Sequence, residues 1–579
     1  MVGVLVALAV LAAAGYWQRE PIRRFVSETV GTAIRHRFIA FTSLLTYQPR
    51  DTADMAPVRH GDVNPYAINV FLEQEVDEVK IRRTLEMVRA AGFTTIKQQV
   101  LWSEIETPRK GQYGDTFDTW AKYDRLVALA HEYGLALILR VDTSPQWARR
   151  FSPKIETPPD DFQDYGDFLA TLATRYRGKV RYYQIWNEPN LAFEWGDVGP
   201  DASEYSRLLR LSFVRLKRAD PDCLVVAAAL APTLEESARG ISDLRYLQGM
   251  YDAGARDYFD VMSTNAYGLR HSPDDYRLDQ ERDVNFARPV LVREVMVRNG
   301  DAEKPIWVAE VGWNALPADF GEEARYGIVS REQQAAYTVR AYQRAQEEWP
   351  WLGVMALWHF RMAHERDQTQ QQYYFNTVDA GFVPYPVYTA MAEQARGAPA
   401  FYRGFYQEDN WRLSLPAGWA PRQDARASLG AYAATERGEG AALELRFVGT
   451  GLTLVTRKCP ECGGLALAVD SQERAVGRQC DAGGSDPGDL SSPTDEWRAR
   501  VPLVCNLPAG LHTVRLRPEP LRPRGEGGTL VVFDGFIVEG PTAQQTLYAR
   551  LTTGGLAAGG VILAVVLAKW RRRWRLRWQ

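Results

Sequence analysis

The sequence predicts an α/β protein in which a (β/α)8 barrel, also called a TIM barrel, is followed by an all-β sandwich, with a hydrophobic helix at each end. Three observations predict this order. Between about residues 65 and 400, strand-like runs alternate with helical patterns, as in successive βα units. After about Gly404 the pattern changes to short alternating segments separated by Gly and Pro. The segments 1–17 and 551–568 contain no charged side chain.

The composition is that of an ordinary globular protein. Of 579 residues, 46% are hydrophobic and 24% are charged, and 69 Lys and Arg oppose 72 Asp and Glu, which gives a formal net charge of −3. These fractions argue against a disordered chain, a collagen-like repeat and a polytopic membrane protein. The near-zero charge argues against a nucleic-acid partner bound through a basic surface.

The uncharged ends predict export and attachment to a cell membrane. As a helix, residues 551–568 would cover about 27 Å, enough to cross a thin bilayer. The tail 569–579 contains six Lys and Arg, which the positive-inside rule places in the cytoplasm. Residues 1–17 are expected to be a signal peptide or a membrane anchor. Both alternatives stay open because the apolar run lacks the preceding Lys or Arg that is typical of a signal peptide. Residues 18–60 are expected to connect this end to the barrel.

Residues 61–404 are expected to form the barrel. Helical patterns at Thr119–Tyr133, Glu204–Arg218 and Arg331–Glu348 are expected to cover it. A doubly wound sheet is the alternative, but no Gly-rich phosphate loop follows the first strand. The eight expected strands are Ala67–Phe71, Thr95–Val100, Ala136–Val141, Val180–Ile185, Cys223–Ala229, Phe259–Thr264, Pro305–Val311 and Val354–His359.

Residues 405–545 are expected to form the sandwich, either as a carbohydrate-binding module or as a spacer. Trp411, Trp419 and Trp497 are candidate sugar platforms if their rings are exposed. The expected strands are Leu443–Val448, Leu452–Val455, Leu465–Val469, His512–Leu516 and Leu530–Val538.

Four of the five cysteines lie in this second region, at Cys459, Cys462, Cys480 and Cys505. In an exported protein two disulfides are the favoured interpretation, and a four-thiolate zinc site is the alternative. With 7 histidines and no HExxH spacing, we expect no catalytic metal and no cofactor.

Two expected strand ends carry a glutamate in apolar surroundings. The fourth strand runs into WNEPN at residues 186–190, and the seventh into EVGW at residues 310–313. In a barrel, catalytic groups lie where the strands end. Two facing carboxyl groups suit cleavage of a glycosidic bond, in which one attacks the anomeric carbon and the other protonates the leaving oxygen. The alternative for each glutamate is a buried structural role.

Aromatic residues gather at the same strand ends. Trp147, Trp186, Trp195, Trp313 and Trp358 all fall at or just beyond an expected strand end. Flat sugar faces stack on such rings. Trp147, Trp313 and Trp358 are therefore candidate substrate contacts.

From about residue 65 to 400 the chain resembles the clan of retaining (β/α)8 glycoside hydrolases, and within it the family of β-xylosidases, α-L-iduronidases and bacterial exopolysaccharide hydrolases. The segments WNEPN and WVAEVGW match the clan's two catalytic strands. The resemblance implies Glu188 as acid/base, Glu310 as nucleophile and Asn187 as donor to the sugar 2-hydroxyl. It also implies that Tyr267 bonds the nucleophile and that Trp358 forms the floor of a sugar subsite.

One part of the clan's pattern differs. Many members carry an Arg late on strand two and a His on strand three, whereas this chain has Gln98, Gln99 and then Arg140 with Asp142. Arg140 is expected to take a supporting role near the carboxylates.

These observations together predict a membrane-anchored retaining glycoside hydrolase. Its expected partner is an extracellular or cell-surface polysaccharide or oligosaccharide, with β-linked bonds expected. The catalytic part is expected outside the cell and the C-terminus in the cytoplasm. The alternatives are a transglycosylase and a non-catalytic polysaccharide-binding surface protein.

Overall fold

The computed structural model describes residues 50–278, 283–362, 364–436, 441–474, 476–477, 488–519 and 528–542, together with residues 480 and 545. The expected terminal segments 1–17 and 551–568 and the tail 569–579 lie outside these ranges. Within the described ranges, no helix combines the length and the apolar character needed to cross a bilayer.

The first region is a parallel barrel, as expected. Its eight strands lie in the order β5-β4-β3-β2-β1-β10-β9-β8, and parallel bridges from Val226 to Val261 and from Leu230 to Thr264 join the two ends of this sheet. The order follows the chain without the reversal that a doubly wound sheet requires. The strands are β1 Tyr66–Val70, β2 Thr95–Leu101, β3 Ala136–Asp142, β4 Tyr182–Ile185, β5 Leu224–Val226, β8 Met262–Tyr267, β9 Ile306–Gly312 and β10 Leu352–Leu357.

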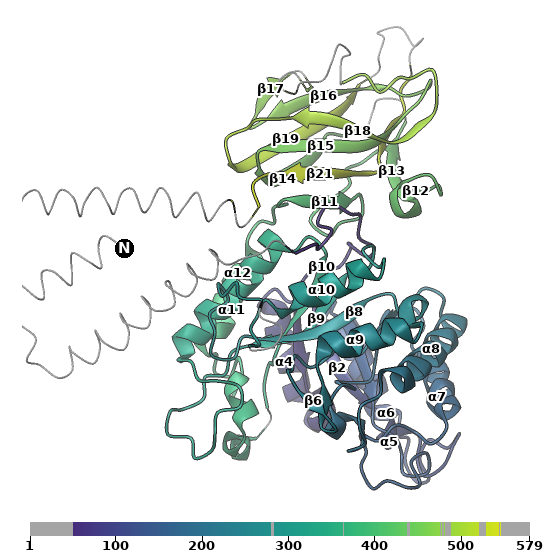
Figure 1. The fold of residues 1–579 in the computed structure, drawn as a ribbon, viewed down its shortest axis with the longest axis vertical. Helices are drawn as coiled ribbons and strands as arrows, with labels where there is room; N and C mark the ends of the chain where they lie inside the picture. Colours follow the sequence, from purple (N-terminus) through teal and green to yellow (C-terminus); the bar gives the residue numbers. More distant parts are fainter. Residues whose placement is uncertain are drawn as a thin grey trace, which may run out of the picture. The chain divides into compact units, whose positions relative to one another are not determined.

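Helices alternate with these strands along the chain, and Figure 1 shows α7 and α8 side by side at the right of this region. Side-chain caps fix where several of them begin: Ser330 and Gln333 form a capping box at the start of α11. The helices are α4 Glu78–Ala90, α5 Trp102–Ile105, α6 Ala121–Glu132, α7 Phe162–Arg175, α8 Ala202–Ala219, α9 Asp243–Asp252, α10 Arg288–Arg298, α11 Arg331–Glu348 and α12 Pro386–Arg396. Short 3-10 helices are η2 Leu72–Gln74, η3 Ala192–Trp195, η4 Ala255–Tyr258, η5 Glu365–Thr369 and η6 Gln371–Phe375, and β6 Glu236–Ser237 and β7 Gly240–Ile241 form a small hairpin.

The sixth barrel strand begins later than the sequence predicts. The expected strand was Phe259–Thr264, but β8 covers Met262–Tyr267. The helix η4 occupies the chain just before it, and the Asp260 carboxylate accepts a hydrogen bond from the Val225 amide at 2.7 Å, so residues 259–261 form the approach to the sheet. Asn265 and Tyr267 are therefore strand residues that share one face of β8.

The second region consists of antiparallel sheets with the orders β11-β21-β15-β18, β14-β19-β16-β17 and β12-β13-β20. The expected strand Leu530–Val538 is divided into β20 and β21 at Asp534, whose buried carboxylate accepts from the Ser428 amide at 2.9 Å. The strands are β11 Gly404–Gln407, β12 Ala420–Gln423, β13 Ala431–Thr435, β14 Leu443–Gly449, β15 Gly451–Lys458, β16 Gly464–Val469, β17 Gln472–Arg474, β18 Glu496–Val504, β19 Gly510–Glu519, β20 Val531–Phe533 and β21 Gly535–Glu539, with the 3-10 helix η7 Ser428–Gly430.

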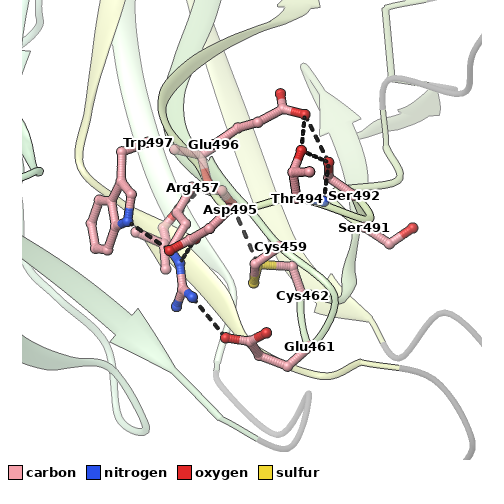
Figure 2. The surroundings of a disulfide bond; sticks show 12 residues. Arg457, Cys459, Glu461, Cys462, Ser491, Ser492, Thr494, Asp495, Glu496 and Trp497 are labelled. Atoms are coloured by element: carbon pink, nitrogen blue, oxygen red, sulfur yellow. Dashed lines mark hydrogen bonds and ion pairs between the residues drawn. A yellow bond between two sulfur atoms is a disulfide. The ribbon is translucent and has the colours of Figure 1, made fainter.

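The structure joins Cys459 to Cys462 and Cys480 to Cys505 through disulfides. Beside the first of these, Figure 2 shows Arg457 between the carboxylates of Asp495 and Glu461, next to Trp497.

The three tryptophans proposed as sugar platforms differ in exposure. The Trp497 ring has the Arg426 and Arg457 guanidinium groups at 4.9 and 5.2 Å from its centroid. Trp419 belongs to the core of the sandwich. Trp411 is partly buried and carries the Arg412 guanidinium 4.7 Å from its ring centroid. Packing therefore already engages all three rings.

Candidate active site

Glu188 lies in the segment that follows β4. The Trp186 amide donates to the Val141 carbonyl and the Glu188 amide to the Ala229 carbonyl, both at 3.0 Å, so neighbouring barrel segments hold this turn on both sides. Trp186 and Glu188 have φ values of 69° and 35°. A left-handed backbone at a residue other than glycine costs about 1–3 kcal/mol and is concentrated at functional sites. The turn around Glu188 is therefore a strained but firmly held segment.

Glu310 lies inside β9, and only 5% of its surface is exposed. Three side chains from two other strands donate to its carboxylate: Lys97 Nζ at 3.1 Å, Tyr267 Oη at 2.6 Å and Asn265 Nδ2 at 3.4 Å. The hydrogen bond from Tyr267 is the one that the resemblance implied.

The two glutamates lie close together. Asn265 Nδ2 is 2.6 Å from Glu188 Oε1 and 3.4 Å from Glu310 Oε2. These two carboxylate oxygens can therefore be at most about 6.0 Å apart. Carboxyl groups that work with a covalent intermediate stand about 5–5.5 Å apart, whereas those that activate a water directly stand about 6.5–9.5 Å apart. The limit applies to one pair of oxygens, and it is compatible with the shorter spacing.

The carboxyl group of Glu188 holds a proton at neutral pH. Burial raises the pKa of Glu188 to about 8, with further upward contributions from the charges of Glu310 and Glu194, while Asn265 and Lys97 oppose the shift. An acid with such a pKa can donate a proton near neutral pH.

Lys97 is a site residue that we did not predict. It projects from β2 with 2% of its surface exposed and contacts Glu310. It places an amino group beside the nucleophile candidate, in the strand where the clan pattern has an arginine; burial lowers the pKa of Lys97, and the charge of Glu310 opposes this shift. The signal in the sequence was the segment TIKQQVL, in which Thr95, Lys97 and Gln99 share one face of the strand.

Arg140 occupies the neighbouring strand β3. Its Nε lies 2.8 Å from the Asp142 carboxylate, which also accepts from Gln99 Nε2 at 2.7 Å. Glu310 and Glu194 also interact electrostatically with Arg140. This placement agrees with a supporting role through neighbouring carboxylates.

The predicted residue Asn187 is buried and donates a hydrogen bond to Glu194. Glu194 is a second site residue that we did not predict. The Asn187 Oδ1 atom has no hydrogen-bond partner. Burial raises the pKa of Glu194 to about 7, and the Arg140 charge opposes this shift. The Glu194 carboxyl group thus hydrogen-bonds Asn187, the residue that the resemblance assigns to the sugar 2-hydroxyl.

Half-buried aromatic rings lie near the carboxylates. Trp358 follows β10 and packs against the edge of Phe71, with ring centroids 5.5 Å apart. Tyr326, also not predicted, lies with its ring centroid 5.8 Å from that of Tyr267. Burial raises the pKa of Tyr326, and the charges of Glu188 and Glu310 add to the shift. Trp358 and Tyr326 are therefore the aromatic candidates for sugar contact.

The structure places Trp313 in the core and not where a substrate could touch it. The side chain has no exposed surface, and its Nε1 donates to the His271 carbonyl at 2.7 Å. Gly268 lies against it so closely that an added Cβ would meet the indole at 1.9 Å. The Trp313 ring packs against Phe286 and against Tyr337 of α11, which its position at the end of a strand did not reveal.

Trp147 lies in the loop after β3, and its contact with substrate stays a prediction. It is half-buried, and its Nε1 donates to the Glu106 carbonyl at 2.7 Å. Its ring also meets the buried Trp102 edge to face, with centroids 5.7 Å apart. Trp147 therefore ties the loop after β3 to the loop after β2.

Removing the cation beside Glu310 is expected to destabilise the protein. Lys97→Met would leave a carboxylate buried without its ion-pair partner, at a cost of about 3–5 kcal/mol in the free energy of unfolding. Adding Glu310→Gln should recover most of this loss. Urea titrations of the two single variants and the double variant measure it, and strictly additive effects would contradict the expectation.

No family model matches the chain, and no curated protein matches it. Among solved structures, the chain is similar to a family 39 glycoside hydrolase from Bacteroides cellulosilyticus WH2, with 19% identity and a TM-score of 0.46 over 80% of this chain and 83% of that one. It is also similar to a GH39 β-xylosidase from Caulobacter crescentus, with 14% identity and a TM-score of 0.42 over 80% and 97% of the chains. A third similar structure is GH5_18 from Streptomyces cattleya in complex with GlcNAc, with 17% identity and a TM-score of 0.45 over 59% and 82%. These values do not assign the chain to a family.

Proposed function

We propose that the protein is a retaining glycoside hydrolase that cleaves a β-linked glycosidic bond in a polysaccharide or oligosaccharide. The observation that carries the proposal is the pair of glutamates at the barrel strand ends, joined by one shared donor. Glu188 holds a proton at neutral pH, whereas Glu310 accepts from Lys97 and Tyr267. One carboxyl group is thus ready to give a proton and the other to attack.

In the first half of the reaction, a Glu310 oxygen bonds to the anomeric carbon while the bond from that carbon to the leaving oxygen breaks. The Glu188 proton moves to the leaving oxygen. In the second half, a water oxygen bonds to the anomeric carbon, its proton moves to Glu188, and the bond to Glu310 breaks. Both carboxyl groups then regain their starting states, and the sugar keeps its configuration.

The pH dependence of catalysis is expected to follow Glu188. The proposed acid must be protonated, and its pKa in the free protein is about 8. We therefore expect kcat/KM to fall about tenfold per pH unit above this value. A pH profile on an unactivated oligosaccharide measures it, and a profile that is flat up to pH 10 would contradict the assignment.

Product analysis tests the proposed function directly. We would incubate the protein with β-linked xylo-, gluco-, galacto- and manno-oligosaccharides and follow the anomeric protons by NMR. A first-formed product with the β configuration supports the proposal, and an α product rejects the retaining mechanism. Products longer than the substrate would identify a transglycosylase, and binding without any product would identify a non-catalytic receptor.

We also propose that the enzyme acts at the outer face of a cell membrane, anchored by residues 551–568 with the tail 569–579 in the cytoplasm. The support is the uncharged segment and the six following cations. Protease treatment of intact cells tests this topology: removal of the catalytic region with protection of the tail supports it, and protection of both rejects it.

A further inference from the structure

One amide group connects the two glutamates. Asn265 Nδ2 donates to Glu188 at 2.6 Å and to Glu310 at 3.4 Å. Glu310 has two further donors, in Lys97 and Tyr267. In the described part of the chain, no other side chain donates a hydrogen bond to Glu188. Glu188 therefore depends on Asn265 more than Glu310 does.

The orientation of this amide follows from chemistry. An ionised carboxylate can only accept hydrogen bonds, so the amide presents its nitrogen to Glu310 and cannot present its oxygen. The Asn265 side chain has no exposed surface, and its Oδ1 atom has no hydrogen-bond partner. The environment around Asn265 is thus built around its N–H group.

The backbone of β8 aims this side chain. The pairing between β8 and β9 shifts register between Thr264 and Asn265, and Asn265 then lies opposite Glu310. The backbone N–H of Asn265 also donates to the Leu230 carbonyl at 3.1 Å. Irregularities of this kind occur beside active sites, where they redirect a side chain.

We infer that Asn265 is a positioning residue for the second half of the proposed reaction, where it stabilises the carboxylate form of Glu188 that receives a proton from water. The inference rests on the proposed function. The Asn265 NH2 group has two N–H donors, and it is shared between Glu188 and Glu310. Once Glu310 is esterified to the sugar it is uncharged and a weaker acceptor, so the NH2 group is no longer held between two carboxylates and donates mainly to Glu188.

The charged and titratable groups that face Glu188 come from several elements. Asn265 lowers the pKa of Glu188, so its removal should raise this pKa. The charges of Glu310 and Glu194 raise the pKa of Glu188, and the charge of Lys97 lowers it. The groups are Glu310 on β9, Glu194 on η3, Lys97 on β2, Tyr267 on β8 and Tyr326 in the loop after β9.

A carboxyl titration tests the inference without any substrate. We would label glutamate with ¹³C, identify the Glu188 signal by its loss in Glu188→Gln, and titrate the wild type and Asn265→Ala. We expect the pKa of Glu188 to rise by about one unit, because a hydrogen bond to a charged group is lost. Asn265→Leu, which keeps the volume, should give the same shift, and an unchanged pKa in both variants overturns the inference.

Asn314→Ala is the matched control. Asn314 is equally buried, and its Oδ1 also has no hydrogen-bond partner, but its Nδ2 donates to the Gln371 carbonyl and not to a carboxylate. This variant should leave the pKa of Glu188 unchanged. An equal shift in Asn314→Ala would mean that loosening the barrel moves the pKa, which overturns the specific role of Asn265.

Kinetics then locate the step. With a 2,4-dinitrophenyl β-glycoside that the wild type cleaves, Asn265→Ala should keep the burst of dinitrophenol but lower steady-state kcat about tenfold, and sodium azide should restore the rate. Loss of the burst together with kcat overturns the inference. If the wild type cleaves no 2,4-dinitrophenyl β-glycoside of any sugar tested, the proposed function fails. The carboxyl titration still decides whether Asn265 controls the pKa of Glu188.

Discussion

Glu310→Ala is expected to lower hydrolysis by a factor of roughly 10⁴ or more, because the group that forms the covalent intermediate is missing. Its environment agrees with this role: it accepts from Lys97 and Tyr267 and is buried in β9. Initial rates of product formation from the most active oligosaccharide measure the loss.

Glu408→Gln serves as the control for Glu310→Ala. Glu408 is also buried, and burial raises its pKa to about 8, but it follows β11, outside the barrel. The Glu408 variant should therefore keep wild-type activity. If circular dichroism shows both proteins to be folded, equal activity of Glu310→Ala and the wild type would contradict the assignment of Glu310 as the nucleophile.

Glu188→Ala is expected to have an effect that depends on the leaving group. An oligosaccharide needs a proton on its departing oxygen, so its cleavage should slow by about 10²–10⁴-fold. A dinitrophenyl glycoside leaves without that proton, so its first step should be nearly unaffected while the second step slows.

Two further measurements check this second prediction. Azide, a nucleophile that needs no general base, should accelerate the variant and give a β-glycosyl azide. The alkaline decline in activity that reflects the Glu188 pKa should disappear. An equal loss of rate on both substrate types, without azide rescue, would mean that Glu188 is not the acid/base.

The sequence predicted the barrel and its eight strands because most of the strands are short runs rich in apolar residues, and a helical segment separates each strand from the next. It also predicted Glu188, Glu310 and Tyr267, which stand in recognisable segments at strand ends. Lys97 and Asn265 were missed because their role depends on which face of β2 and β8 points to Glu310. For β8, that face follows a register shift between Thr264 and Asn265, which apolar periodicity does not reveal.

An error of a second kind concerns a residue that does stand at a strand end. Trp313 was expected to contact substrate, yet it is fully buried and its indole N–H group bonds the His271 carbonyl. A strand-end position says where the chain leaves the sheet, but not whether the side chain then turns to solvent or to the interior. Glu194 and Tyr326 belong to loops, whose paths the sequence pattern does not define.

The contact between Gly268 and Trp313 sets a limit on how this site can vary. Gly268 follows Tyr267 directly, and Trp313 comes three residues after Glu310. Any larger residue at position 268 would need the space of the indole, which an added Cβ would approach to 1.9 Å. A substitution at either position must therefore be matched at the other to conserve the total volume. Positions 268 and 313 therefore form one unit of shared volume beside the Tyr267–Glu310 hydrogen bond, and a search for compensating changes should consider them together.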